Sequence, residues 1–79
     1  MDNLKKYNLA FCEAFELSQE ELLGLQYQQI ELWDSVGHMT LVANLEDAFD
    51  IMMETDDIID LSSYEKGLEI LKNKYGIEL

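Results

Sequence analysis

Ser35 is the side chain in this sequence whose surroundings most clearly suggest chemistry. It lies in the stretch LWDSVGHM, residues 32–39, directly after Asp34 and three residues before His38, which is the only histidine. A serine in such a position can cap a helix, act as a nucleophile, or serve as a covalent attachment point. These three possibilities imply different classes of protein.

A nucleophilic role for Ser35 lacks the partners that it needs. Such a serine requires a base to accept its proton and a third group to orient that base. His38 lies one turn further along the same predicted helix, where its side chain is expected to project toward the core rather than over the hydroxyl. No G-x-S-x-G turn surrounds the serine. We therefore expect no enzymatic activity, and we expect His38 to be a partly buried polar residue.

The remaining reactive side chains predict no metal site. There is one cysteine, Cys12, and neither a CxxC nor an HxxxH spacing occurs. The acidic stretch DDIIDLSSYEKG lacks the central glycine and the alternating oxygen ligands of a calcium loop. Cys12 has no histidine or lysine close in sequence to lower its pKa, so we expect an unreactive small apolar residue.

The charge of the chain restricts its partners. Seventeen acidic residues face only five lysines, which gives a net charge of −12, and no lysine or arginine occurs between Lys6 and Lys66. Such a chain is repelled by nucleic acid and by anionic membrane surfaces, and it attracts proteins with basic patches. No apolar run approaches the ~18 residues that span a membrane. We expect a monomer that neither binds nucleic acid nor inserts into a membrane. A lone cysteine and the absence of a signal-peptide pattern predict a cytoplasmic location.

Apolar periodicity predicts a single all-α domain over residues 1–79. A first helix follows Asp2 as its N-cap, and a long first connection, 17–34, is held to the core by large apolar residues that include Leu32. A short third helix is expected in 54–61. A last helix should start with Ser62 and Glu65 as a capping box and end at Gly76. The expected fold is a four-helix bundle with three longer helices and one short third helix.

The helix predicted from Ser35 to about Asp50 carries two apolar stripes. One faces the core and contains Leu41, Leu45, Ala48, Phe49 and Met52. The other lies on nearly the opposite side and consists of Val36, Met39 and Ala43, with the acids Glu46 and Asp47 continuing it. Because a helix needs only one apolar stripe to fold, the second stripe predicts a docking surface for a partner. The third helix is expected to bury Ile58, Ile59 and Leu61.

The start of this helix also suits a covalently attached phosphate. Free N–H groups and the helix dipole favour an anion there. Gly37 in the first turn is expected to leave the backbone uncrowded, so that an arm attached to Ser35 can leave the surface. A capping role and an attachment role for this serine need not compete.

The stretch DSVGHMTLVANLEDAFDI, residues 34–51, resembles the attachment motif and following helix of the acyl carrier protein family. The likeness extends from about residue 30 to 72 and includes DDIIDLSSYEKGLEIL. It implies an acyl-carrier-like bundle in which Ser35 receives 4′-phosphopantetheine from coenzyme A, through a magnesium-dependent phosphopantetheinyl transferase. The thiol of the arm would hold acyl or aminoacyl groups as thioesters. It further implies docking through Asp34, Val36, Met39, Ala43, Glu46 and Asp47, and an acyl chain sheltered between the second and third helices.

Two departures from the family pattern favour a specialised pathway over the main fatty-acid pathway. Gly37 and Thr40 stand where the family usually has acidic residues. The Asp-Ser-x-Gly form resembles carriers of D-alanine and other stand-alone carriers of secondary-metabolite or surface-polysaccharide pathways. Partners implied by the resemblance are loading ligases and acyltransferase-type enzymes with basic docking patches. The alternative is an acidic helical interaction module without a prosthetic group, and the sequence does not specify the cargo.

Overall fold

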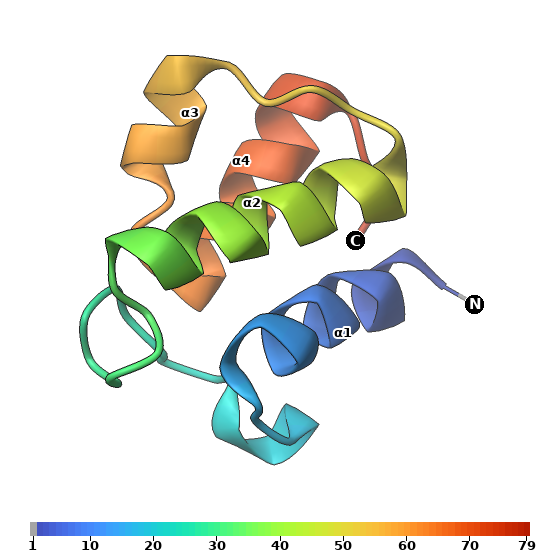
Figure 1. Ribbon diagram of the computed structural model, residues 1–79. Coiled ribbons are helices and arrows are strands. Elements are labelled where there is room, and N and C mark those ends of the chain that lie inside the picture. The colour runs from blue at the N-terminus through green and yellow to red at the C-terminus, as the bar shows by residue number, and fades with distance from the viewer. Residues whose placement is uncertain (1) are drawn as a thin grey trace.

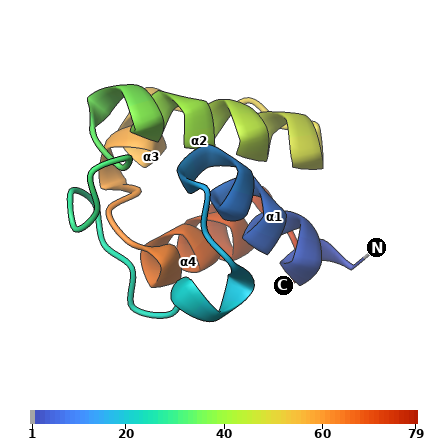
Figure 2. The same cartoon turned by 60° about the horizontal axis from the view of Figure 1, so that its bottom comes forward.

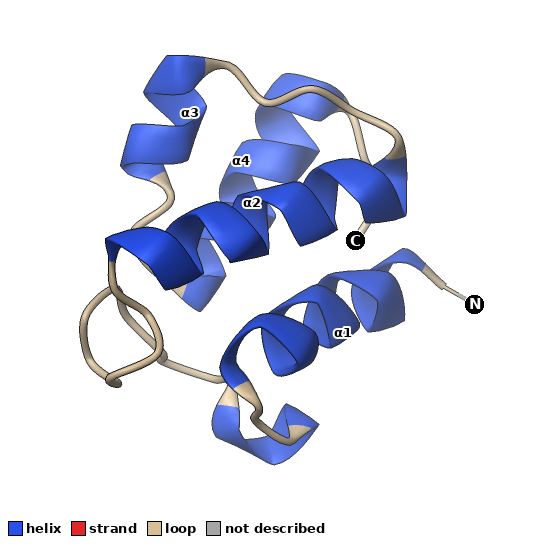
Figure 3. Cartoon of the chain, viewed as in Figure 1, coloured by secondary structure: helices blue, strands red, loops and turns tan. Residues whose placement is uncertain are grey.

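Residues 2–79 are described in the computed structural model, and their regular structure is helical (Figures 1 and 3). The elements are α1 (Asn3–Phe15), a short 3-10 helix η1 (Gln19–Glu21), α2 (Ser35–Phe49), α3 (Thr55–Asp60) and α4 (Tyr64–Tyr75). The all-helical prediction is therefore confirmed, with a short third helix and a long first connection. Among the described helices, none combines the length and the apolar character needed to cross a bilayer.

The helices surround a core that is rich in aromatic rings. Helices α1 and α2 run antiparallel side by side, α4 passes behind them, and α3 lies beside the first half of α2 (Figures 1 and 2). The four-residue spacing of Tyr7, Phe11 and Phe15 places all three on the inner face of α1, where each is at most 1% exposed. Trp33 from the long connection is fully buried against this face. Its ring centroid lies 5.6 Å from that of Phe11 and 5.0 Å from that of Phe15. Burial of each such side chain contributes about 1.5–3 kcal/mol.

The ends of α1 and α4 follow local capping rules, with the cap of α4 shifted by one residue from the prediction. Asp2 caps α1 by accepting a hydrogen bond from the backbone N–H of Lys5 at 2.7 Å, as predicted. The predicted capping box of α4 is wrong, because Ser63 and not Ser62 caps this helix, accepting from the N–H of Lys66. Gly76 ends α4 in the left-handed conformation, at φ 66°, as expected.

Backbone pairing explains why Ser62 is not the cap. The carbonyl of Ser62 accepts from the N–H of Tyr27 at 2.8 Å, and the N–H of Tyr64 donates to Leu25 at 2.8 Å. These two bonds hold the chain extended before α4 begins and fasten the long connection to the link between α3 and α4. Leu32, expected to be buried in this connection, is 46% exposed.

Two further apolar residues that were expected to be buried lie on the surface. Met52 is 85% exposed because α2 ends at Phe49 and Asp50 turns the chain in the left-handed conformation, so the helical spacing no longer applies. Ile59 is 71% exposed because the inner face of α3 is set by Asp57 and Leu61, which are 3% and 1% exposed.

The carboxylate of Asp57 fastens α3 to the end of α4. It accepts hydrogen bonds from Lys74 Nζ and Tyr75 Oη, both at 2.7 Å. These two bonds hold the pKa of Asp57 below its ordinary value. A buried carboxylate of this kind is tolerated because it is paired.

Candidate functional site

Ser35 is the first residue of α2, and its neighbour Asp34 is the helix cap. Asp34 has extended backbone angles, and its Oδ1 accepts from the N–H of Gly37 at 2.8 Å. The expectation that Ser35 caps the helix is therefore wrong. The carboxylate of Asp34 takes one of the N–H groups that a helix start leaves without an intrahelical partner. Ser35 is exposed, at the end of α2 that lies away from both chain termini (Figures 1 and 2).

Gly37 stands where the long connection touches α2. A Cβ atom on Gly37 would lie 1.8 Å from the carbonyl oxygen of Leu32 and 3.3 Å from Phe15 Cε1. The expectation of an uncrowded backbone is thus wrong on this side, since only a glycine lets the loop approach the helix so closely. Because Gly37 has no side chain, the loop that leads into Ser35 can pack directly against the first turn of α2.

His38 is partly buried and bridges two segments, as its predicted inward orientation requires. Trp33 Nε1 donates to His38 Nδ1 at 2.9 Å, and His38 Nε2 lies 2.7 Å from the carbonyl oxygen of Ile58 in α3. The imidazole and indole planes are nearly parallel, at 14°. His38 is therefore a structural link between the loop, α2 and α3, and it does not approach Ser35 as a base would.

The predicted docking residues divide into an exposed group and a structural one. Val36 and Met39 are 74% and 52% exposed, and Ala43 is exposed on the same side of α2. Glu46 is only partly exposed, and its Oε2 accepts from the N–H of Met53 at 2.8 Å, which holds the turn after α2. An apolar stripe thus starts beside Ser35, but Glu46 also has a role in the fold.

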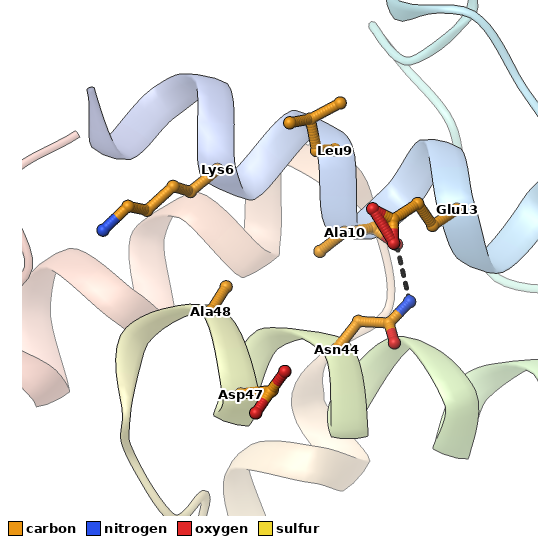
Figure 4. Close-up of a pocket in the computed structure, with 7 residues that line it drawn as sticks. All are labelled: Lys6, Leu9, Ala10, Glu13, Asn44, Asp47 and Ala48. Carbon is orange, nitrogen blue, oxygen red and sulfur yellow. Dashed lines mark hydrogen bonds between the residues drawn. The ribbon is translucent and has the colours of Figure 1, made fainter. Parts of the chain in front are cut away.

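Asp47, the last of the predicted docking residues, lines a hollow of about 240 Å³ between α1 and α2 (Figure 4). Asn44 lies on the same wall, and its amide donates to the carbonyl of Ala10 at 3.1 Å. Asp47 is exposed at this hollow. Its position next to α1 separates it from the residues at the start of α2.

A second hollow, of about 280 Å³, lies where α2, α3 and the long connection meet. It is lined by Tyr27, His38, Ile58, Ile59, Leu61 and Ser62. Tyr27 has no part in the sequence-based site, whereas Ile58 and Ile59 belong to the third helix, beside which an acyl chain was expected to be sheltered. The residues come from three segments that are distant in the chain, so no local spacing pattern could have indicated them.

Charge is distributed unevenly over the fold. All five lysines belong to α1 and α4, whereas residues 7–65 contain none. Within residues 2–79, no group of three or more His, Cys, Asp or Glu side chains is arranged to hold a metal ion. Partial burial and the nearby acids Glu21 and Glu13 raise the pKa of Cys12, which makes its thiol a poor nucleophile at neutral pH.

Comparison of the chain with protein-family models, with curated proteins and with solved structures finds no match. A function for this protein therefore rests on its own residues: an exposed serine at a helix start, an exposed apolar stripe beside it, and a helix without lysine or arginine that carries both.

Proposed function

We propose that the protein is a non-catalytic carrier, with an acyl-carrier-like fold, that bears 4′-phosphopantetheine on Ser35. The observation that carries this proposal is the separation of two roles at the start of α2. Asp34 caps the helix, so the exposed hydroxyl of Ser35 is not needed for capping and is accessible to an enzyme. A bound arm would supply a flexible thiol that carries acyl or aminoacyl groups as thioesters.

The surroundings of Ser35 fit a group that enzymes must add and then use. The acidic residue Asp34 directly precedes Ser35 in the chain, and no lysine or arginine occurs on α2 or α3. A phosphodiester on Ser35 would gain nothing from local cations, so its neutralising charges would come from the partner. We therefore propose a phosphopantetheinyl transferase, loading ligases and acyltransferase-type enzymes with basic patches as partners, recruited faster at low ionic strength.

Val36 and Met39 supply apolar contact area beside the attachment point. Both are more than half exposed, and they lie on one side of α2 within a turn of Ser35. In transient complexes a few such anchors carry most of the binding energy, while surrounding charges set the encounter rate.

The test is covalent labelling of Ser35. The purified chain is incubated with coenzyme A, Mg²⁺ and a broad-specificity transferase, and its intact mass is measured. The wild type should gain one phosphopantetheinyl group and Ser35→Ala none. Since Asp34 provides the cap, Ser35→Ala should keep the helical circular dichroism and melting temperature of the wild type. Failure of the wild type to gain mass, or equal labelling of the variant, would reject the carrier function.

An interaction module without a prosthetic group is the second candidate, favoured by the exposure of Val36 and Met39. The two functions predict opposite results in the cell of origin. A carrier loses activity with Ser35→Ala, whereas a module keeps it. Met39→Glu should impair both, because it places a charge on the exposed stripe. Activity retained by Ser35→Ala and lost by Met39→Glu would favour the module.

A further inference from the structure

The hydrogen bonds of His38 determine which of its ring nitrogens carries the proton. An indole N–H can only donate, so the contact from Trp33 Nε1 makes His38 Nδ1 an acceptor. The neutral ring then carries its proton on Nε2, which donates to the carbonyl of Ile58 at 2.7 Å. His38 therefore connects the buried Trp33 on one side with the backbone of α3 on the other.

This bridge joins α2 to α3 close to Ser35. His38 is one turn beyond Ser35 on α2, a rise of about 4.5 Å, and its partner Ile58 lies in the middle of α3. Behind the bridge, Trp33 is fully buried and packs against Phe11 and Phe15. The hollow at this junction is lined by His38 and Ile58, the two residues of the bridge, and not by Trp33.

We propose that His38 is a latch that closes the gap between α2 and α3, and that it restricts the cargo carried at Ser35 to short or polar acyl groups held outside the core. This inference rests on the proposed attachment at Ser35. A long apolar chain could enter only by breaking the bond to Ile58 and displacing rings that already fill the interior. An aminoacyl group or a short acyl group needs no such entry.

The outer hollow supports this limit on cargo size. Pockets that bury drug-sized ligands measure about 300–1,000 Å³, and this hollow, at about 280 Å³, lies just below that range. Its wall is mostly apolar, with Ile58, Ile59 and Leu61 beside the ring of Tyr27 and the side chain of Ser62. A short acyl group fits this hollow, whereas a long fatty chain would extend beyond it into water.

The latch can be tested without any transferase, by chemical attachment at the same position. In a Cys12→Ala, Ser35→Cys background the single thiol is alkylated with N-ethyl- or N-octyl-iodoacetamide. The melting temperature of each product is measured, and the shift of the octyl product relative to the ethyl product is the readout. Because the octyl and ethyl products of the same variant are compared, a loss of stability caused by the substitution itself does not affect this shift.

Two substitutions of His38 distinguish the bond to α3 from the bond to Trp33. The amide nitrogen of Gln is as many bonds from Cα as Nε2, so His38→Gln keeps a donor for Ile58. The amide oxygen of Asn corresponds to Nδ1, so His38→Asn keeps the acceptor for Trp33 and loses the latch. The octyl chain should leave the melting temperature unchanged with His38 or His38→Gln. In the His38→Asn variant the octyl chain should raise the melting temperature by more than about 5 °C, since burial of its methylene groups then becomes possible.

Two results would overturn the latch: an equal octyl-dependent rise with His38 present, or no rise with His38→Asn. Neither result depends on whether a transferase modifies Ser35. To connect the latch with cargo, the arm is then loaded enzymatically with acetyl or octanoyl thioesters and hydroxylamine cleavage is timed. Equal cleavage rates for the two thioesters in the wild type, with slower octanoyl cleavage in His38→Asn, are expected. Slower octanoyl cleavage in the wild type would reject the limit on cargo, and failure to load at all would reject the carrier function while leaving the alkylation result intact.

Discussion

Replacement of Gly37 by alanine tests the close approach that positions the loop before Ser35. The added Cβ would lie 1.8 Å from the carbonyl oxygen and 3.0 Å from the carbonyl carbon of Leu32. Carbon atoms in contact settle at about 3.5–4.0 Å, so the backbone of the loop must retreat. The obstacle is main chain rather than the free end of a flexible side chain, and the neighbouring Trp33 is anchored in the core.

The expected change in the free energy of unfolding of Gly37→Ala is the difference between a packing penalty and a gain in helix propensity. Forcing extra volume into a packed site costs about 1–3 kcal/mol, with the upper part of the range apt for a backbone obstacle. Alanine returns up to about 1 kcal/mol because it favours the helix more than glycine does. The net free energy of unfolding should fall by about 1–2 kcal/mol, which is a large share of the roughly 3–5 kcal/mol available to a domain of this size.

The assay is urea unfolding followed by fluorescence of Trp33, which is the only tryptophan. With a slope near 1 kcal/mol/M, the midpoint of Gly37→Ala should fall by about 1–2 M. Val36→Ala is the matched control, because this neighbouring side chain is 74% exposed, and its midpoint should change little. A Gly37→Ala midpoint at or above that of the wild type, with the control unchanged, would refute the idea that the contact with Leu32 requires a glycine.

Three further predictions address the cap, the clamp on α3 and the thiol. Asp34→Ala should lower the free energy of unfolding by about 1 kcal/mol through loss of the N-cap. An unchanged midpoint in chemical denaturation would show that Asp34 does not stabilise the helix as its cap. The hydrogen bonds from Lys74 and Tyr75 lower the pKa of Asp57, so their stabilisation is complete above the unfolded value of about 3.9 and is lost as pH falls through the folded value. The melting temperature of the wild type should therefore exceed that of Asp57→Asn at pH 7 by more than at pH 3, and a constant difference would contradict this. Cys12, whose pKa is raised, should react with iodoacetamide at pH 7 more slowly than free cysteine, as timed by mass spectrometry; an equal or faster rate would contradict the raised pKa.

The sequence pattern predicts the helices well and their first residues less well. Apolar spacing is a property of whole helices, so the inner face of α1 and the exposed side of α2 could be inferred from it. Capping depends on the backbone angles of one residue, and each misplaced cap involves two adjacent candidates, Asp34 with Ser35 and Ser62 with Ser63. Side-chain types alone do not show which of the two neighbours has the extended conformation.

The contacts of the candidate site could not be predicted from the sequence, for a different physical reason. The carbonyl group of Leu32 packs against Gly37, and the carbonyl group of Ile58 bonds to His38. Every residue has such a carbonyl group. No residue type therefore marks these contacts in the sequence. The inward orientation of His38 could be predicted from its place on α2, but its partners could be identified only from the fold.

Every lysine belongs to α1 or α4, whereas α2 and α3 together contain five acids and no lysine. Ser35 is exposed at the start of α2, one of these two helices without a lysine. In the field of a cationic protein this uneven charge would produce a torque on the molecule before any contact forms, so that rotational diffusion becomes biased. Encounters would then begin with the serine already facing the partner, and the same asymmetry would disfavour approach through α1 and α4.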